Sequence, residues 1–427
     1  MPQYLAPGVY VEEVPSAVRP IAGVGTSTAG FVGVVPDTVP VPNPAFKATQ
    51  AEDATNNPKL IQFTSPAAGE ARLCTNFGEF VRQFGDFSSV PDNSLLAHAA
   101  YGFFNNGGTR CYVARVAAAG NIGAALTSFA AIDEIALVAA PGLTTKTAET
   151  AVINHCEGLE DRFAILDTMQ VIEANNVFSP DLIDPSKDTG QKNLPGDSDY
   201  AAVYAPWLQV FDPALSLQEQ WRAAGDPDNP IADPAAALRY VPPSGHVAGI
   251  YARVDSERGV HKAPANEVVR GALDLAYRIS RDQQTSLNQN GVNCIRSLNG
   301  NIRVWGARTL GGDANAEWKY VNVRRLFLFL RESIDQGTQW VVFEPNDASL
   351  WAKIRRNVEA FLTNVWRDGA LFGDTAAQAF YVKCDEETNP PEVRDLGQVV
   401  TEIGVAVVKP AEFVVFRISQ WAGPPGN

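Results

Sequence analysis

The first two thirds of the chain alternate short apolar runs with amphipathic segments. Strands are predicted at 31–35, 110–116, 134–139, 163–167 and 202–207, and helices at 76–85, 94–104, 148–156 and 266–279. Most strands are thus followed by a helix and then by another strand, which is the order of βαβ units. The pattern predicts an α/β domain with a mostly parallel sheet covered by helices.

The last third has a different pattern of strands and long helices. Strands are predicted at 302–310, 340–344, 380–384, 402–408 and 413–418. One helical face begins at Val323 and ends before Gly337, and a second helix runs from Asp347 as its cap to Gly369 as its stop. This part therefore predicts a smaller α+β domain.

Both ends of the chain read as strands without a sheet. Four prolines within residues 1–20 forbid a stable helix there, but Gly8–Val14 is free of proline and rich in strand formers. The strand predicted at Phe413–Ile418 follows Lys409-Pro410, and its first four residues, Phe413–Phe416, are apolar on both faces. Such a segment is disordered, folds back on its own domain, or pairs with a strand edge on another molecule.

Three regions between the predicted elements have their own composition. Residues 36–70 carry five prolines up to Pro58 and little periodicity, and 170–235 begins with a polar surface excursion, so both are expected to be insertions. Gly23, Gly25 and Gly30 precede the first buried strand. A dinucleotide loop would follow a strand and needs glycine where Thr28 stands, so the segment is interpreted as a flexible hinge.

Charge and cysteine content limit the class of protein. The 34 Lys+Arg against 48 Asp+Glu give a formal charge of −14, and no long basic run is present, which argues against binding of nucleic acid. The N-terminus lacks the pattern of a signal peptide, and no apolar run reaches the ~20 residues of a membrane span. The five cysteines are far apart and lack metal or redox spacing, as expected of free thiols in a reducing compartment.

Candidate chemistry is sparse, and neither a metal nor a cofactor is expected. The four histidines have no metal spacing. His155 and Cys156 are adjacent on a predicted helix and therefore point in different directions, which does not suit a thiolate and its base. The strongest catalytic alternative is a hydrolase whose triad would combine Ser244 with Asp255 and either His246 or His261, or one that uses a pair of carboxylates.

Several stretches taken together resemble the contractile tail sheath family of phages, R-type tailocins and extracellular contractile injection systems. They occur in the family's order over nearly the whole chain, beginning with Ala-Pro-Gly-Val-Tyr-Val-Glu-Glu. The matching stretches are Ala6–Glu13, Phe31–Gly33, Phe104–Gly108, Pro242–Gly245, Gly249–Arg253, Gly259–Asn266, Asn301–Leu310, Tyr320–Arg325, Phe343–Asn346 and the helix through Trp351.

The resemblance implies a subunit with two domains and two linking arms. The expected division is an N-terminal arm 1–20, a middle α/β domain 21–299, an inner C-terminal domain 300–410 and a C-terminal arm 411–427. Each arm would add a strand to a sheet of a neighbouring subunit, while Gly23 and Gly25 would act as the hinge. The residues implied for the donated strands are Val9, Tyr10, Val11, Glu12, Phe413, Val414, Val415 and Phe416.

The function implied is structural, without enzymatic activity. Subunits would stack as hexameric rings into a helical sheath around an inner tube, on a baseplate and under a terminator or cap protein, and would contract to drive the tube through a target envelope. Assembly is expected in the bacterial cytoplasm, with no nucleic acid bound and no insertion into a membrane. The alternatives are the hydrolase and a sheath-like cap or adaptor that does not polymerise.

Overall fold

The computed structural model describes residues 20–170, 183–184, 197–224 and 237–417. These residues form two compact units. The larger unit is built on Val24–Phe329 and also includes residues 408–417; the smaller is built on Leu330–Val407 together with residues 20–23. The chain passes from one unit to the other within a helix, between Phe329 and Leu330, and the domain boundary expected at 299–300 stays a prediction.

The larger unit contains a nine-stranded sheet within its described residues. The strand order is β11-β14-β13-β8-β7-β6-β1-β5-β4, and the run from β13 to β5 is parallel. The predicted α/β fold with a mostly parallel sheet is confirmed. The strands are β1 Ala29–Val34, β4 Arg72–Cys74, β5 Cys111–Val116, β6 Leu137–Ala139, β7 Phe163–Asp167, β8 Ala201–Ala205, β11 Glu267–Val268, β13 Val292–Leu298 and β14 Asn301–Val304.

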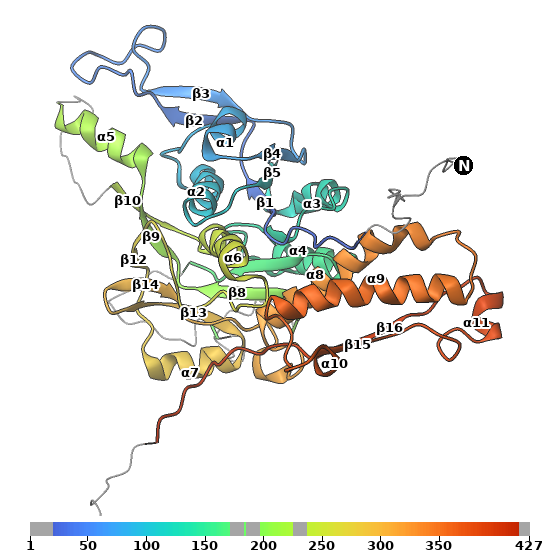
Figure 1. Ribbon diagram of the computed structural model, residues 1–427. Helices are drawn as coiled ribbons and strands as arrows, with labels where there is room; N and C mark the ends of the chain where they lie inside the picture. The colour runs from blue at the N-terminus through green and yellow to red at the C-terminus, as the bar shows by residue number, and fades with distance from the viewer. Residues whose placement is uncertain (1–19, 171–182, 185–196, 225–236, 418–427) are drawn as a thin grey trace, which may run out of the picture. The chain divides into compact units, whose positions relative to one another are not determined.

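Helices cover both faces of this sheet. In Figure 1, α2 and α6 pack together on one face and α3 and α4 lie on the other. All residues of β7 and β8 are buried, as expected of strands covered on both sides. The helices of the larger unit are α1 Phe77–Phe84, α2 Pro91–Asn105, α3 Ile122–Ala130, α4 Lys146–Leu159, α5 Pro213–Ala223, α6 Ser244–Arg258 and α7 Arg281–Gln289, with the first part of α8 Val321–Thr338.

Two further strand sets belong to the larger unit. β9 Leu208–Phe211 pairs antiparallel with β10 Leu238–Val241 and β12 Ala272–Leu275. The hairpin of β2 Thr38–Pro42 and β3 Leu60–Thr64 lies in the region 36–70 that was expected to be a loop or a small insertion.

The prediction of a helix at 266–279 is wrong. Residues Glu267–Val268 and Ala272–Leu275 are the strands β11 and β12, which pair with β14 and β9. Asn266 and Gly271 have φ values of 61° and 86°, which a right-handed helix does not contain. The apolar spacing was helical, but pairing with distant strand edges determined the conformation.

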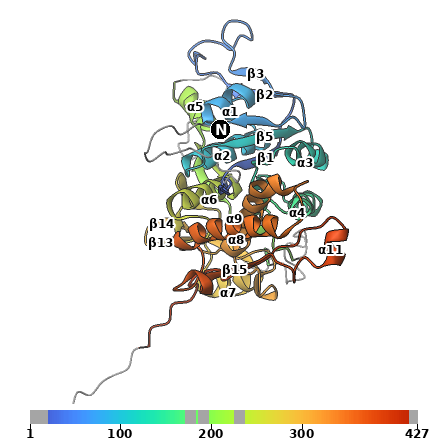
Figure 2. The same cartoon turned by 45° about the vertical axis from the view of Figure 1, so that its right-hand side comes forward.

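The smaller unit is built around a long helix and a two-stranded sheet. α9 Ala348–Arg367 begins where the Asp347 side chain accepts a hydrogen bond from the Leu350 amide and ends before Gly369, as predicted. The antiparallel strands β15 Phe380–Lys383 and β16 Glu402–Val405 were also predicted. Figure 2 shows α9 alongside β15, against which it packs. Two short helices, α10 Ala376–Ala379 and α11 Pro391–Asp395, complete the unit.

Two predictions in this unit are wrong. The strand expected at 340–344 is a 3-10 turn over Gln339–Val341 followed by a bend, because local hydrogen bonds such as Val342 N–H to Gln339 O replace a partner strand. α8 also continues through Gly337 rather than ending before it. A Cβ at Gly337 would lie 2.6 Å from Ile21, so glycine serves close packing here and not helix termination.

Candidate functional site

The predicted C-terminal strand is an exposed apolar segment in the described chain. Phe413, Val414, Val415 and Phe416 are 71%, 68%, 76% and 84% exposed, which is unusual for four successive large apolar residues. No strand pairing is formed by residues 408–417. Figure 1 shows this segment extending away past α7. Val9, Tyr10, Val11 and Glu12, the corresponding residues of the N-terminal arm, lie outside the described residues.

The smaller unit has strand edges that could receive such a segment. β15 and β16 pair only with each other among the described strands, so the outer edge of each strand is open to a further one. Tyr381 on β15 is 59% exposed. A two-stranded sheet is marginal by itself and gains stability from added strands or from a covering helix.

The two predicted hinge glycines lie where the chain passes between the units. Gly23 is the last residue assigned with the smaller unit before the chain enters the larger one at Val24. A Cβ at Gly25 would meet no heavy atom within 4 Å, so packing does not require glycine at this position. The position of both residues is compatible with a hinge.

Ser244, the candidate nucleophile of the hydrolase alternative, is fully buried at the start of α6. Its hydroxyl donates to Asp167 Oδ2 at 2.7 Å, and its backbone N–H donates to Asp167 Oδ1 at 2.8 Å. Burial raises the pKa of Asp167 to about 6, against the lowering effect of the hydrogen bonds from Ser244. The hydroxyl therefore makes a buried contact with Asp167 at the end of β7 and is not presented to a substrate.

The other members of that candidate triad do not form a catalytic arrangement with Ser244. Asp255 forms a two-pronged ion pair with Arg325, with N–O distances of 2.9 and 2.6 Å, and accepts a bond from Thr26. His246 is buried, and burial together with the charge of His98 lowers its pKa to about 3. No hydrogen bond joins Ser244 to His246 or His261. The structure does not assemble a triad from these residues.

His155 and Cys156 also lack the features of a catalytic pair. Cys156 is fully buried, and burial raises the pKa of its thiol, so the reactive thiolate is disfavoured. Burial and the neighbouring Arg162 lower the pKa of His155 to about 4. His155 Nε2 lies 3.4 Å from the Arg162 guanidinium, so this ring nitrogen is already in contact with a hydrogen-bond donor and is not available to Cys156 as a base.

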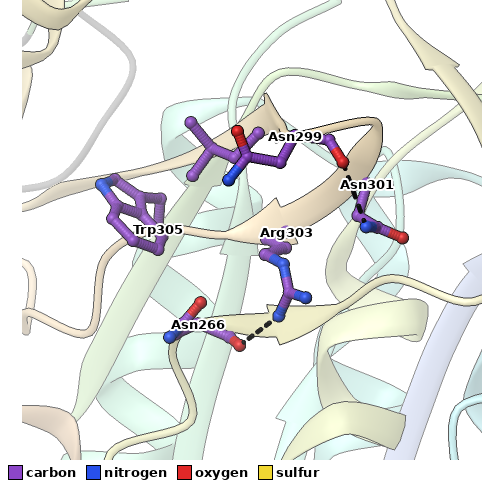
Figure 3. Close-up of a pocket in the computed structure, with 6 residues that line it drawn as sticks. Asn266, Asn299, Asn301, Arg303 and Trp305 are labelled. Atoms are coloured by element: carbon purple, nitrogen blue, oxygen red, sulfur yellow. Dashed lines mark hydrogen bonds between the residues drawn. The ribbon is translucent and has the colours of Figure 1, made fainter.

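A hollow of about 420 Å³ lies beside β14 (Figure 3). Arg303 is its only ionisable lining residue, and its guanidinium donates to the backbone oxygen of Asn266 at 2.9 Å. Arginine stays protonated and cannot transfer protons at neutral pH. The lining therefore offers no acid, base or nucleophile. The lining residues are Asn266, Leu298, Asn299, Asn301, Arg303 and Trp305.

The part of the chain that the structure describes contains neither a metal-binding cluster nor a membrane-spanning helix. No group of three or more His, Cys, Asp or Glu side chains there is arranged to hold a metal ion. None of its helices combines the length and apolar character needed to cross a membrane.

One residue with a clear structural role was missed by sequence patterns. Glu412, directly before the exposed apolar segment, accepts hydrogen bonds from Arg308, Asn288 and Tyr320. In the sequence, Glu412 is marked only as a single carboxylate between Pro410 and an apolar run. Its hydrogen-bond partners lie 92 to 124 residues away, so no local pattern predicts them.

The described residues thus combine an exposed apolar terminal segment with a two-stranded sheet that pairs with no other described strand. Two family models match the chain: the phage tail sheath protein central domain over residues 117–310 and the phage tail sheath C-terminal domain over residues 313–420. Together they cover well over half of it. The chain belongs to the phage tail sheath family.

Known relatives agree with this assignment. The sheath complex of an extracellular contractile injection system (PVC) in its contracted state matches with a TM-score of 0.71 and 26% identity over 99% of each chain. The tail sheath protein of Vibrio phage KVP40 is 31% identical over 42% of this chain and 26% of its own. A putative prophage major tail sheath protein of Pseudomonas aeruginosa is 24% identical over 67% and 65%. The chain thus spans about a quarter to two thirds of the length of these two curated relatives.

Proposed function

We propose that this chain is the structural subunit of a contractile sheath, which polymerises helically around an inner tube and contracts to drive that tube through a target envelope. The observation that carries the proposal is similarity over 98–99% of the chain to sheath subunits of contracted injection systems. The buried positions of Ser244 and Cys156 give no support to the hydrolase alternative.

The arms supply the connections between subunits. Phe413–Phe416 of one copy adds a strand to the β15–β16 sheet of a neighbouring copy, and Val9–Glu12 does the same from the other end of the chain. Support comes from the exposed apolar side chains of the first segment and the open edges of the sheet. A head-to-tail contact between copies that does not close into a ring generates a helical assembly of subunits, as a tubular sheath requires.

Gly23 and Gly25 allow the two units to change orientation while the arms remain paired. Their position at the passage between the units supports this role. Energy for contraction is the difference between two packings of one subunit, summed over many copies, so no nucleotide is needed.

The partners follow from this function. The sheath consists of stacked hexameric rings of this chain, contacts an inner tube protein, and is bounded by a baseplate and a terminator or cap protein. It binds no nucleic acid and does not insert into a membrane. It is assembled in the bacterial cytoplasm as part of a phage tail or of a released or cell-associated contractile particle.

The test compares the full chain with a variant that lacks residues 413–427. Sedimentation and negative-stain microscopy are expected to show striated hollow tubes for the full chain and their loss for the truncated chain. A truncated chain that remains folded by circular dichroism and forms tubes of normal length would contradict strand donation. A full chain that forms only closed rings would favour the cap or adaptor.

A further inference from the structure

Within the described part of the C-terminal arm, residues 411–417, Glu412 is hydrogen-bonded to the rest of the larger unit. Its Oε1 accepts from Arg308 Nε and from Asn288 Nδ2, at 2.8 and 2.9 Å. Its Oε2 accepts from Arg308 NH2 and from the Tyr320 hydroxyl, both at 2.9 Å. Both carboxylate oxygens are thus bonded twice, and the pairing with Arg308 has the parallel two-bond geometry that makes such contacts directional.

Arg308 is itself fixed in place. Its side chain is only 3% exposed, and its NH1 donates to Asn288 O at 2.8 Å and to Asp313 Oδ1 at 3.0 Å. Its backbone is held on both sides by Asn293, which accepts from the Arg308 N–H at 2.7 Å and donates to the Arg308 oxygen at 2.8 Å. Glu412 therefore binds a rigid, prearranged cation.

The contacts with the rest of the larger unit differ on either side of Glu412. Before it, the backbone oxygen of Val408 lies 3.5 Å from Asn322 Nδ2. After it, the next four side chains are 68–84% exposed. Glu412 is thus the last described residue whose side chain is hydrogen-bonded to the rest of the larger unit.

We propose that Arg308 and Glu412 form an anchor that fixes the root of the C-terminal arm on the larger unit of its own subunit. The partner on the far side of the arm is a second copy of this chain, and that part of the inference rests on the proposed function. Arg308 and Glu412 act as positioning residues. They determine where the arm leaves the subunit, and the apolar residues make the contact.

The anchor shortens the flexible link between copies. Without it, the free segment would begin at Val408, where the chain leaves the smaller unit. The additional residues would lengthen the link by roughly 15 Å at about 3.3 Å per residue. A longer and looser link lowers the effective concentration of the arm at the neighbouring sheet. A force on the arm would also have to extend this longer link before the force was transmitted to the nine-stranded sheet.

Spin labelling of the full chain tests the anchor directly. All five native cysteines are buried, so a cysteine introduced at the exposed position 411, as Ala411→Cys, can be labelled selectively. The label is expected to show a slow, immobilised spectrum in the otherwise native chain. Glu412→Ala should convert most of that component to a fast one, and Glu412→Gln should do so partly, because an amide accepts from Arg308 through only one oxygen.

Glu386→Gln, an exposed carboxylate removed elsewhere in the chain, is the matched control and should leave the spectrum unchanged. Tube formation by the same variants is measured by sedimentation and is expected to fall with label immobilisation. An unchanged spectrum in Glu412→Ala, or a mobile spectrum with normal tubes, would overturn the anchor. Normal tubes from the chain lacking 413–427 would instead overturn strand donation, so the two failures are distinguishable.

Discussion

Asp167 at the end of β7 receives two hydrogen bonds from Ser244 at the start of α6, one from the hydroxyl and one from the backbone N–H, at 2.7 and 2.8 Å. The pair joins the central sheet to the helix that packs against α2. A serine next to Gly245 and His246 resembles catalytic chemistry in sequence. In the fold it is a buried structural contact.

Ser244→Ala is therefore expected to lower stability without changing any chemistry. Asp167 Oδ2 would lose the shorter of its two hydrogen bonds and keep only the one from the Gly142 N–H at 3.2 Å, which costs about 1–3 kcal/mol of unfolding free energy. Denaturant unfolding measures the effect. Ser256→Ala, an exposed serine on the same helix, is the control and should change little. Equal stability of Ser244→Ala and the native chain would refute the structural role.

Glu149 makes the stability of the larger unit depend on pH. Its side chain is buried, neither of its oxygens has a hydrogen-bond partner, and burial, reinforced by the charge of Asp167, raises its pKa from 4.5 to about 9. In the unfolded chain this carboxyl ionises above about pH 4.5, but in the folded chain it stays protonated. The unfolded state is thus favoured increasingly as pH rises from about 4.5 to about 9.

Glu149→Gln removes the loss of folding stability that Glu149 causes as the pH rises. The variant is expected to be more stable than the native chain at pH 8, by on the order of 2–4 kcal/mol. The difference should shrink towards zero near pH 4, where both states of the native chain carry a neutral side chain, so the low-pH measurement is the internal control. Denaturant unfolding at both pH values measures it. A gain that is equal at pH 4 and pH 8 would show that ionisation of Glu149 is not responsible.

Gly337→Ala tests the close packing of α8 in the smaller unit. Alanine usually stabilises a helix interior relative to glycine by about 1 kcal/mol. Here the added Cβ would meet Ile21 Cγ1 at 2.6 Å, so a loss of about 1–3 kcal/mol is expected. Gly158→Ala on α4 is the control, since a Cβ there meets nothing within 4 Å and should be neutral or stabilising. Thermal unfolding that places both variants above the native chain would contradict the packing.

Polar substitution of the arm tests its contact without deletion. Phe413→Ser with Phe416→Ser should leave the unfolding transition nearly unchanged, because both side chains are exposed in the described chain. The same variant should strongly reduce tube formation. Ile61→Ser, at an exposed apolar residue of the β2–β3 hairpin, controls for a general effect on solubility. Equal tube yields from the arm variant and the native chain would exclude Phe413 and Phe416 from the contact.

Local signals in the sequence were sufficient for much of the fold. The caps at Asn76 and Asp347 place helix starts, because a side-chain oxygen in each case accepts from an amide three residues later. The βαβ order likewise predicts the parallel sheet. These features depend on neighbours within a few residues or on a repeated element order.

Pairing between distant segments explains what the sequence did not reveal. Residues 266–279 form strands because β9 and β14 offer them edges, whereas residues 340–344 make local hydrogen bonds, such as Val342 N–H to Gln339 O, and pair with no described strand. Glu412 and Arg308 are 104 residues apart. The local sequence around each residue does not predict their contact, although the apolar run that follows Glu412 was predicted as a terminal strand.

Helical reconstruction of tubes grown from the purified full chain would show directly which sheet the C-terminal arm joins. We expect a hollow helical tube in which Phe413–Phe416 of each copy forms an added strand on the β15–β16 sheet of a neighbouring copy. A sheet that remains two-stranded in the tube, with each arm folded back on its own subunit, would contradict the account.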